Sequence, residues 1–336
     1  MPVKKFRFDA SNGEHQIQAV LWTPDGGGEP RGVLQIAHGM HEYGERYSEF
    51  AGFMTARGYA VCANDHAGHG DSYKDANLRG YFGAKNGYLH MVGDMRELMR
   101  LVRAEFPERA GEPGRGGGPP AEAPARQGAA RPGLPYFLLG HSMGSFLARY
   151  FCSLYGDELS GAIFSGTGNG PAVLPLGVLL CRAQVRLFGA TYRSKGGAMY
   201  RLSRSAYLKR FVPVRTGAEW LTRDEKKALE SRDDPRSKFI FTAGGNLDLL
   251  RVLNRVSSPK WAAKIPAGLP VLLFSGSEDP VGHNGKDVRK VYSWLKAAGC
   301  KDVTVKIYEG GRHEMLNEIN RAEVFEDVAG WIEKRT

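Results

Sequence analysis

The chain has 336 residues, 42% of them hydrophobic, so it can bury a large core in one long domain or two ordinary ones. Lysine and arginine total 46 against 36 aspartate and glutamate, a net charge of +10 that is spread along the sequence. The densest basic stretch, residues 182–215, has no zinc-finger spacing and no RNP-like string, so we expect no nucleic-acid partner.

The cysteines and the apolar runs of the sequence indicate the cellular compartment of the protein. The four cysteines are widely spaced and form no C-x-x-C pair, which is typical of buried thiols in a reducing cytoplasm. No apolar run follows the basic residues Lys4, Lys5 and Arg7, so we expect no secretory signal. The longest apolar stretch, residues 171–181, is shorter than the roughly 20 residues that a membrane span needs. We therefore expect a cytoplasmic protein.

Strand-like and helix-like segments alternate along the chain, which predicts an α/β fold with a mainly parallel, twisted sheet flanked by helices on both faces. Short apolar runs that end in turn residues predict strands, and apolar residues at a 3.6-residue period predict helices. The predicted strands are residues 17–22, 32–37, 59–63, 136–139, 161–165, 271–276 and 303–308. The predicted helices are residues 47–57, 91–106, 145–155, 286–298 and 322–334.

Two segments depart from the alternation. Residues 107–135 contain seven Pro, seven Gly and six Ala and no aromatic residue, which predicts a disordered surface insertion without a function of its own. Residues 169–260 are long, basic and helix-like, and we predict that they form a helical cap over the carboxyl edge of the sheet, where α/β proteins place ligands. The predicted core is therefore residues 1–168 and 261–336.

The string Gly140-His141-Ser142-Met143-Gly144 predicts a nucleophile elbow. A bare G-x-S-x-G is common, but this one lies between an apolar strand and an amphipathic helix, where the tight turn requires small flanking residues. Such a turn exposes Ser142, and the N-terminus of the following helix favours negative charge that develops beside it. The alternative is a serine that only builds the turn.

A serine hydroxyl needs a base, and in this arrangement the acid and then the histidine follow the serine along the chain. His313 lies in a loop after the last predicted strand, and Asp279 lies after the preceding strand, where Pro280 stiffens its loop. We predict that His313 is the general base and that Asp279 orients its imidazole. Glu278 remains the rival acid.

A buried strand ends at residues 38–40, where an oxyanion hole is expected to take a backbone donor. We predict the backbone N–H groups of Met40 and Met143 as the two donors, each typically worth about 2.7–4 kcal/mol of transition-state stabilisation. His38 itself is expected to be structural.

Other histidines are expected to have structural roles. Asp65, His66 and His69 lie in a glycine turn after a strand, and a metal site is the alternative there. His141 and His283 are interpreted as neighbours of the site without a catalytic role. No phosphate-loop pattern occurs, and we expect neither a metal nor a cofactor.

Several strings carry a resemblance to a known family: His38-Gly39-Met40 with Glu45-Arg46-Tyr47, residues 65–72, 140–144, 215–216 with 219–224, 279–282 and 311–314. With them the chain resembles the monoacylglycerol lipase and lysophospholipase branch of the α/β hydrolases, except in residues 107–135. The resemblance implies the triad Ser142, Asp279 and His313, the oxyanion donors Met40 and Met143, glycerolipid ester substrates, and a cap that forms an acyl-chain tunnel. Prolyl aminopeptidases and general carboxylesterases share much of this pattern.

We therefore expect a serine hydrolase that cleaves carboxylic esters of monoacyl lipids through an acyl-enzyme, with a small-molecule lipid ester as its partner. We expect apolar residues of the cap to lie over the triad; the alternative is that they form only the core of the cap. These residues are Val173, Leu174, Leu176, Val178, Leu179, Leu180, Val185, Leu187 and Phe188. The basic cap also predicts transient, peripheral contact with an anionic membrane surface.

The sequence leaves three further functions open. An aminopeptidase on the same triad would need acidic cap residues to hold the α-ammonium group of its substrate, and the cap is richer in arginine and lysine. The acidic candidates are Glu219, Asp224, Glu225, Glu230, Asp233, Asp234 and Asp248. The other two possibilities are that the chain is a general carboxylesterase or a binding protein without catalytic activity.

Overall fold

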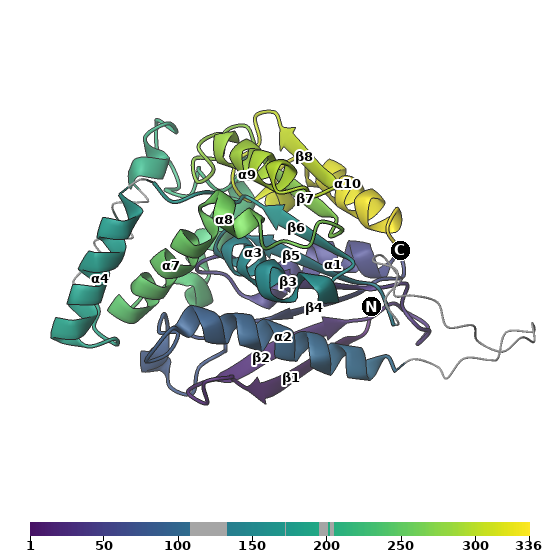
Figure 1. Ribbon diagram of the computed structural model, residues 1–336, viewed down its shortest axis with the longest axis horizontal. Helices are drawn as coiled ribbons and strands as arrows, with labels where there is room; N and C mark the ends of the chain where they lie inside the picture. The colour runs from purple at the N-terminus through teal and green to yellow at the C-terminus, as the bar shows by residue number, and fades with distance from the viewer. Residues whose placement is uncertain (108–132, 172, 195–200, 202–204) are drawn as a thin grey trace, which may run out of the picture.

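The computed structural model describes residues 1–107, 133–171, 173–194, 201 and 205–336, and it contains an eight-stranded sheet between two layers of helices (Figure 1). The strand order is β1-β2-β4-β3-β5-β6-β7-β8. All pairs from β4 to β8 are parallel, whereas β1 and β2 run antiparallel to their neighbours. The predicted α/β fold with a mainly parallel sheet is confirmed.

The strands are β1 (Val3–Asp9), β2 (Gln16–Trp22), β3 (Val33–Ala37), β4 (Ala60–Asn64), β5 (Tyr136–His141), β6 (Gly161–Ser165), β7 (Val271–Gly276) and β8 (Val303–Tyr308). The longer helices are α1 (Ser48–Thr55), α2 (Gly87–Glu105), α3 (Met143–Tyr155), α4 (Leu174–Phe188), α6 (Glu225–Asp233), α7 (Ala243–Val256), α9 (Lys286–Ala297) and α10 (Arg321–Glu333). Short helices include α8 (Pro259–Ala262) and η4 (Pro235–Ser237).

All seven predicted strands and five predicted helices occur, with shifts at their ends. The largest shift is in α2, which begins at Gly87 and not at Met91. Sequence reasoning missed β1, because its charged residues Lys4, Lys5 and Arg7 hide a strand whose Phe6 and Phe8 pack on the core.

Successive residues of the central strands face two separate cores. In β3, Val33 and Ala37 belong to a buried cluster that includes residues of α2, α3 and α9. Leu34 and Ile36 belong to a second buried cluster, which includes residues of α1 and α10. Because both faces are covered, β3 is buried along its whole length, and this explains why its sequence, apart from Gln35, is apolar without alternation.

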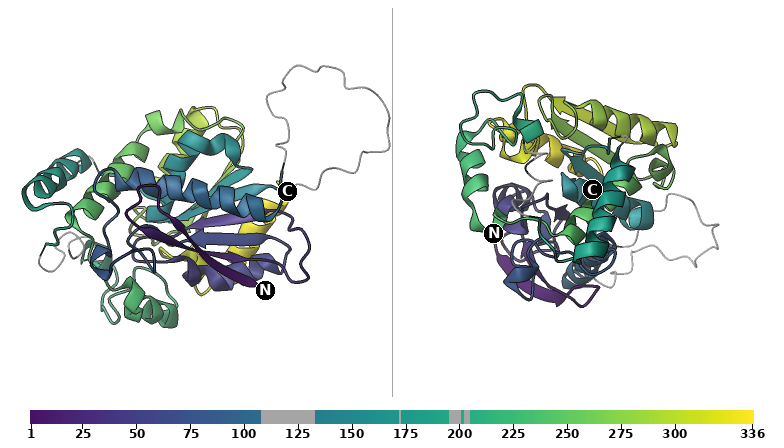
Figure 2. Two further views of the ribbon diagram at one scale, coloured as in Figure 1. Left: turned by 90° about the horizontal axis from the view of Figure 1, so that it is seen from below. Right: turned by 90° about the vertical axis from the view of Figure 1, so that its left-hand side faces the viewer.

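The chain leaves the sheet between β6 and β7, the stretch that contains the predicted cap of residues 169–260. Helix α7 packs on α2 and α3 and also contacts α4, which lies farther from the sheet (Figures 1 and 2). The predicted insertion, residues 107–135, lies almost entirely outside the described residues.

The expectation for the apolar residues of α4 is wrong in large part. Among the nine apolar residues named for the cap, only Leu174 is buried, and six are more than half exposed: Val173, Leu176, Leu179, Leu180, Leu187 and Phe188. They therefore form neither the core of the cap nor a cover over the triad. The reason is that α4 packs mainly on α7, which leaves its outer face uncovered. Within the described part of the chain, no helix combines the length and apolar character needed to cross a membrane.

Candidate active site

The elbow places Ser142 at the carboxyl end of β5. Ser142 lies between β5 and α3 with φ 51° and ψ −119°, a backbone conformation that L residues adopt only where surrounding contacts enforce it. Two hydrogen bonds hold the turn: Ser142 N–H donates to Ser165 O at 3.0 Å, and Ser145 Oγ donates to Ser142 O at 2.6 Å. The serine is therefore fixed by both the neighbouring strand and the following helix.

The elbow has no room for a side chain at either of its two glycines. A Cβ at Gly144 would lie 2.0 Å from Ala37 O, and a Cβ at Gly140 would lie 2.4 Å from Gly144 O. Helix α3 therefore approaches the ends of β3 and β5 at backbone contact distance. At the end of β3, a Cβ on Gly39 would lie 3.2 Å from Ser142 Cβ, so residues 38–40 pack directly against the serine.

Asp279 and His313 form a buried pair at the ends of β7 and β8. His313 Nδ1 lies 3.0 Å from Asp279 Oδ1, and both side chains are at most 2% exposed. Asp279 Oδ2 accepts a hydrogen bond from Ser275 Oγ at 2.7 Å, and Oδ1 accepts one from Val281 N–H at 2.9 Å. The carboxylate is held in one orientation. The rival acid, Glu278, has a 46% exposed side chain that lies 3.9 Å from Arg312 Nε.

The contact between Asp279 and His313 shifts the pKa of both groups. Burial alone would lower the pKa of His313 and raise the pKa of Asp279. The charge that each places on the other and the hydrogen bond between them outweigh burial, so the pKa of His313 is raised and that of Asp279 is lowered. Asp279 is therefore ionised at neutral pH and makes the imidazole a stronger base.

Ser142 and His313 each lie near Gly166, which follows β6. Ser142 N–H binds the residue before Gly166, and a Cβ on Gly166 would lie 3.0 Å from His313 Cε1. Among the described residues, Asp279 is the only side chain that is hydrogen-bonded to the His313 ring. No hydrogen bond therefore joins Ser142 Oγ to His313 Nε2 in this structure. This contact is often long before a substrate binds.

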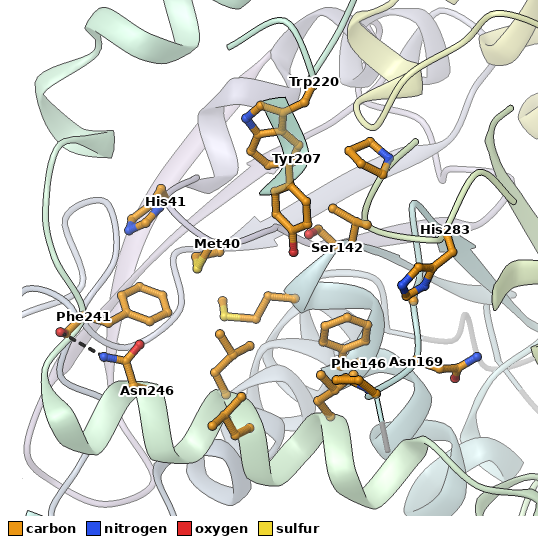
Figure 3. A pocket seen from close by; sticks show the side chains of 18 of the residues that line it. Met40, His41, Ser142, Phe146, Asn169, Tyr207, Trp220, Phe241, Asn246 and His283 are labelled. Atoms are coloured by element: carbon orange, nitrogen blue, oxygen red, sulfur yellow. Dashed lines mark hydrogen bonds between the residues drawn. The ribbon is translucent and has the colours of Figure 1, made fainter. Parts of the chain in front are cut away.

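The two predicted oxyanion donors border the same cavity as Ser142. Met143 is the first residue of α3, where a backbone N–H has no partner within the helix. Met40 lies just beyond β3, and Figure 3 shows its side chain and those of Ser142 and Phe146 around one hollow. The predicted residues 40, 142 and 143 are thus brought together at one edge of the sheet.

The cavity at Ser142, which we call the acyl cavity, has a volume of about 350 Å³. Its lining comes from the loop after β3, the elbow, α7 and the loop after β7, and it contains no Asp, Glu, Lys or Arg among the described residues. The apolar lining residues include Phe146, Tyr207, Trp220, Ile240, Phe241, Leu249, Leu250, Leu253 and Val281. Such a cavity can hold an extended apolar chain next to the serine.

Sequence reasoning missed a buried ion network behind the site. Gly39 N–H donates to Glu42 Oε2 at 2.6 Å, and Tyr47 OH donates to the same oxygen at 2.7 Å. The Arg46 guanidinium lies 3.1 Å from Glu42 Oε1 and 3.0 Å from Glu314 Oε2. Arg46 therefore joins residues 38–42, which carry the predicted donor Met40 and which we call the oxyanion loop, to the loop that carries His313.

One guanidinium serves both carboxylates of this network. Glu42, His141 and Glu314 place potential metal-ligand atoms within 4.8 Å of one another, but Arg46 already bridges the two carboxylates. Burial would raise the pKa of Glu42, but His141 and Arg46 outweigh it and lower the value to about 2. The carboxylate of Glu42 thus stays ionised and keeps the Gly39 amide in place.

The histidines of the glycine turn are buried beside the oxyanion loop. His38 Nε2 accepts a hydrogen bond from His66 N–H at 2.9 Å, and burial lowers the pKa of His66 to about 4. Asp65 accepts hydrogen bonds from Gly44 N–H and Asp71 N–H at 2.7 and 2.8 Å. These contacts are typical of structural residues, which agrees with the interpretation of this cluster.

Comparison with known proteins identifies a family and several relatives. The sequence matches the family Hydrolase_4, described as Serine aminopeptidase, S33, over residues 28–113 and 124–320. It is 28% identical to a monoacylglycerol lipase of Mycolicibacterium smegmatis over 93% of this chain and 91% of that one. It is 24% identical to the human monoglyceride lipase over 94% of this chain and 86% of that one.

Solved structures give the same fold. A thermostable carboxyl esterase from Bacillus coagulans superposes with a TM-score of 0.84 at 27% identity, covering 99% of both chains. A soluble variant of the monoglyceride lipase of Saccharomyces cerevisiae superposes with a TM-score of 0.70 at 18% identity, over 99% of this chain and 95% of that one. At this lower identity the second likeness concerns the fold alone.

The raised pKa of His313 predicts the acid limb of the pH–rate profile. Protonated His313 cannot accept a proton from Ser142, so kcat/KM for p-nitrophenyl butyrate should fall as pH drops through a value above 6.5. Asp279→Asn should move this limb to lower pH and reduce kcat by about 10⁴-fold. Glu278→Gln is the matched control and should keep the wild-type profile. If Glu278→Gln moved this limb and reduced kcat while Asp279→Asn kept the wild-type profile, Glu278 would be the acid.

The ion network predicts a second effect on catalysis. Glu42→Gln should reduce kcat by about ten- to a hundredfold with little change in KM, because the Gly39 amide loses its charged acceptor and the oxyanion loop loosens. Glu49→Gln removes a half-exposed carboxylate that pairs with Lys227 and Arg321, and it should leave kcat unchanged. Both would be measured on p-nitrophenyl butyrate, with thermal unfolding to verify folding. A folded Glu42→Gln variant with wild-type kcat would contradict this role.

Proposed function

This chain belongs to the Hydrolase_4 family, described as Serine aminopeptidase, S33, and we propose that it hydrolyses carboxylic esters of monoacyl lipids through an acyl-enzyme. The observation that carries the proposal is an apolar cavity of about 350 Å³ with Ser142 in its wall and a buried imidazole–carboxylate pair beside it. The similarity to monoacylglycerol lipases and to a carboxyl esterase supports ester hydrolysis.

Each proposed residue has one task in the reaction. Ser142 Oγ attacks the ester carbonyl carbon while His313 Nε2 accepts the hydroxyl proton, and the N–H groups of Met40 and Met143 bind the resulting oxyanion. His313 then donates its proton to the departing alcohol, which leaves the acyl group on Ser142. Water, deprotonated by His313, attacks the acyl-enzyme and releases the carboxylic acid. Asp279 stabilises the imidazolium in both halves.

The lining of the acyl cavity favours a lipid ester over an amino-terminal peptide. An aminopeptidase needs a carboxylate near the serine to bind the α-ammonium group, and none lines this cavity among the described residues. Four of the acidic candidates instead accept hydrogen bonds from backbone N–H groups: Glu219, Asp224, Asp234 and Asp248. We therefore propose the ester substrate although the family description names aminopeptidases.

The exposed face of α4 supports contact with an anionic membrane. Leu176, Leu179, Leu180 and Leu187 are each more than half exposed, and their spacing places them on one stripe of the helix. Arg182 and Arg186 are exposed on the same helix and would add about 1 kcal/mol each near anionic lipid.

This face also lies close to the acyl cavity. A Cβ on Gly177 of α4 would lie 3.4 Å from Leu250 Cδ1, and Leu250 of α7 lines that cavity. Docking through α4 would therefore place the membrane surface one helix away from the proposed path of the acyl chain.

Acyl-chain length tests the lipid substrate. Activity on monoacyl esters should rise at least tenfold between chains of about four and about twelve carbons, because each buried CH₂ contributes about 0.8 kcal/mol. Leu250→Trp should remove this gain by filling the acyl cavity and should leave the four-carbon ester within twofold of wild type. The comparison is a kcat/KM series on purified protein.

Controls separate the substrate from the chemistry. Leu154→Trp changes an exposed leucine of α3 and should keep the full chain-length gain. Ser142→Ala should abolish turnover of every ester and labelling by a fluorophosphonate. Equal rates beyond four carbons would reject the lipid chain, and faster turnover of aminoacyl naphthylamides would favour the aminopeptidase.

The α4 face predicts how the protein binds vesicles. Leu179→Ser with Leu180→Ser should reduce binding to vesicles that contain an anionic lipid by about tenfold, because two exposed apolar side chains are lost. Binding should also weaken as salt rises, since Arg182 and Arg186 are screened. Sedimentation with vesicles measures both, and Leu154→Ser on α3 is the exposed-leucine control. Salt-independent binding, or loss of binding in the control, would contradict docking through α4.

A further inference from the structure

We infer that Arg149 is a positioning residue of the active site, which orients the backbone amide of Met143 and holds two walls of the acyl cavity together. The inference rests on the proposed ester hydrolysis and adds to it a residue that does not line the acyl cavity. Arg149 lies on α3, about two helical turns after Ser142, and its side chain is fully buried.

The guanidinium of Arg149 is buried among uncharged acceptors. Nη1 donates to Gly168 O at 2.9 Å and to Thr167 Oγ1 at 3.2 Å. Nη2 donates to Val256 O at 2.5 Å and to Asn169 Oδ1 at 3.3 Å. Burial lowers the pKa of Arg149 to about 9, which leaves the side chain charged at neutral pH. Because a buried charge without a hydrogen-bonded carboxylate is costly, stability alone does not account for this residue.

One branch of these contacts leads to the nucleophile elbow. Thr167 Oγ1 lies 2.8 Å from Ser145 Oγ, which donates to Ser142 O at 2.6 Å. Since the guanidinium donates to Thr167 Oγ1, the Thr167 hydroxyl is left to donate to Ser145 Oγ. The guanidinium and the two hydroxyls therefore donate in series toward the elbow carbonyl, and hydrogen bonds in series strengthen one another.

The series ends at the peptide group that carries a proposed oxyanion donor. Ser142 C=O and Met143 N–H belong to one planar peptide group and point in opposite directions. A donor that holds Ser142 O therefore fixes the direction of the Met143 N–H, and it also polarises the peptide group so that this N–H donates more strongly. We therefore expect Arg149 to affect the oxyanion, which forms only in the transition state.

The other branch leads to two walls of the acyl cavity. Gly168 and Asn169 line this cavity, and Asn169 is labelled in Figure 3. Val256 is the last residue of α7, and Leu253 of the same helix lines the cavity. A cation is favoured at the C-terminus of a helix, where carbonyl groups lack partners within the helix. Arg149 thus joins the loop after β6 to the end of α7.

The indole of Trp261 in α8 fixes the guanidinium itself. The ring centroid lies 4.4 Å from Arg149 Cζ, and Trp261 Nε1 donates to Arg149 O at 2.6 Å. The planar guanidinium therefore presents both Nη atoms at fixed angles, which the single ammonium of a lysine cannot do. A lysine at this position would keep the charge and lose the pattern of hydrogen bonds.

Variants on purified full-length protein separate the two branches. Arg149→Met keeps the length of the side chain and should reduce kcat on p-nitrophenyl butyrate by about ten- to a hundredfold, because the Met143 amide loses its orientation. Arg149→Lys should not restore kcat. Thr167→Val interrupts only the first branch and should reduce kcat by about fivefold, the effect of one neutral hydrogen bond. Arg149→Met should also lose the gain in kcat/KM with acyl-chain length, whereas Thr167→Val should keep it.

The rate of fluorophosphonate labelling reports on Ser142 and the oxyanion donors without an ester substrate. This rate should fall together with kcat in Arg149→Met and in Thr167→Val. The double variant should be no slower than Arg149→Met alone, because the Thr167 hydroxyl acts in series with the guanidinium. Phe151→Leu is the matched control, since it changes a buried core residue of the same helix. It should lower the midpoint of thermal unfolding and leave kcat and the labelling rate unchanged.

The failures of the two proposals are distinguishable. A less stable Arg149→Met variant with wild-type kcat and labelling would make Arg149 purely structural and overturn the inference, as would independent losses in the double variant. Unchanged rates in Thr167→Val, the milder variant, would overturn it even if Arg149→Met does not fold. Wild-type protein that neither reacts with a fluorophosphonate nor turns over any ester would instead reject the proposed function.

Discussion

The contact between the first turn of α3 and the end of β3 sets the geometry of the whole site. Gly144 lies where a Cβ would meet Ala37 O at 2.0 Å, so the backbone of the helix touches the backbone of the strand. This approach forces Ser142 to a positive φ and brings residues 38–40 against it. Ser142, the helix N-terminus and residues 38–40 therefore share one rigid junction, and none of them can move without the others.

Buried charge is the second constraint on the site. Each carboxylate behind the serine is held by a cation or by several donors: Glu42 by Arg46, and Asp279 by His313 and Ser275. Isolated buried charges would be costly, whereas these partners keep the carboxylates of Glu42 and Asp279 ionised near neutral pH. These interactions therefore fix the positions of the loops and keep the two carboxylates charged. The same contacts make the site rigid and set its reactivity.

Sequence patterns predicted the parts of the molecule that depend on local order. The central strands were predicted because both of their faces are buried, and the elbow because its glycines leave room for a close helix. The orientation of α4 could not be predicted, since its apolar residues cover most of its circumference and only the packing on α7 decides which face is buried. The bridge from Arg46 to Glu314 could not be predicted either, because its partners are far apart in the chain and share no repeating pattern.

The free edge of the sheet has a consequence for self-association. Within the part of the chain that the structure describes, β1 has no strand on its outer side, and an unprotected edge strand invites pairing with another chain. Lys4, Lys5 and Arg7 lie along this strand, where Lys4 and Lys5 pair with Glu105 and Glu45. Charged side chains on an edge strand disfavour its pairing with another chain. The same residues that concealed β1 as a strand therefore protect this edge against pairing with a second copy.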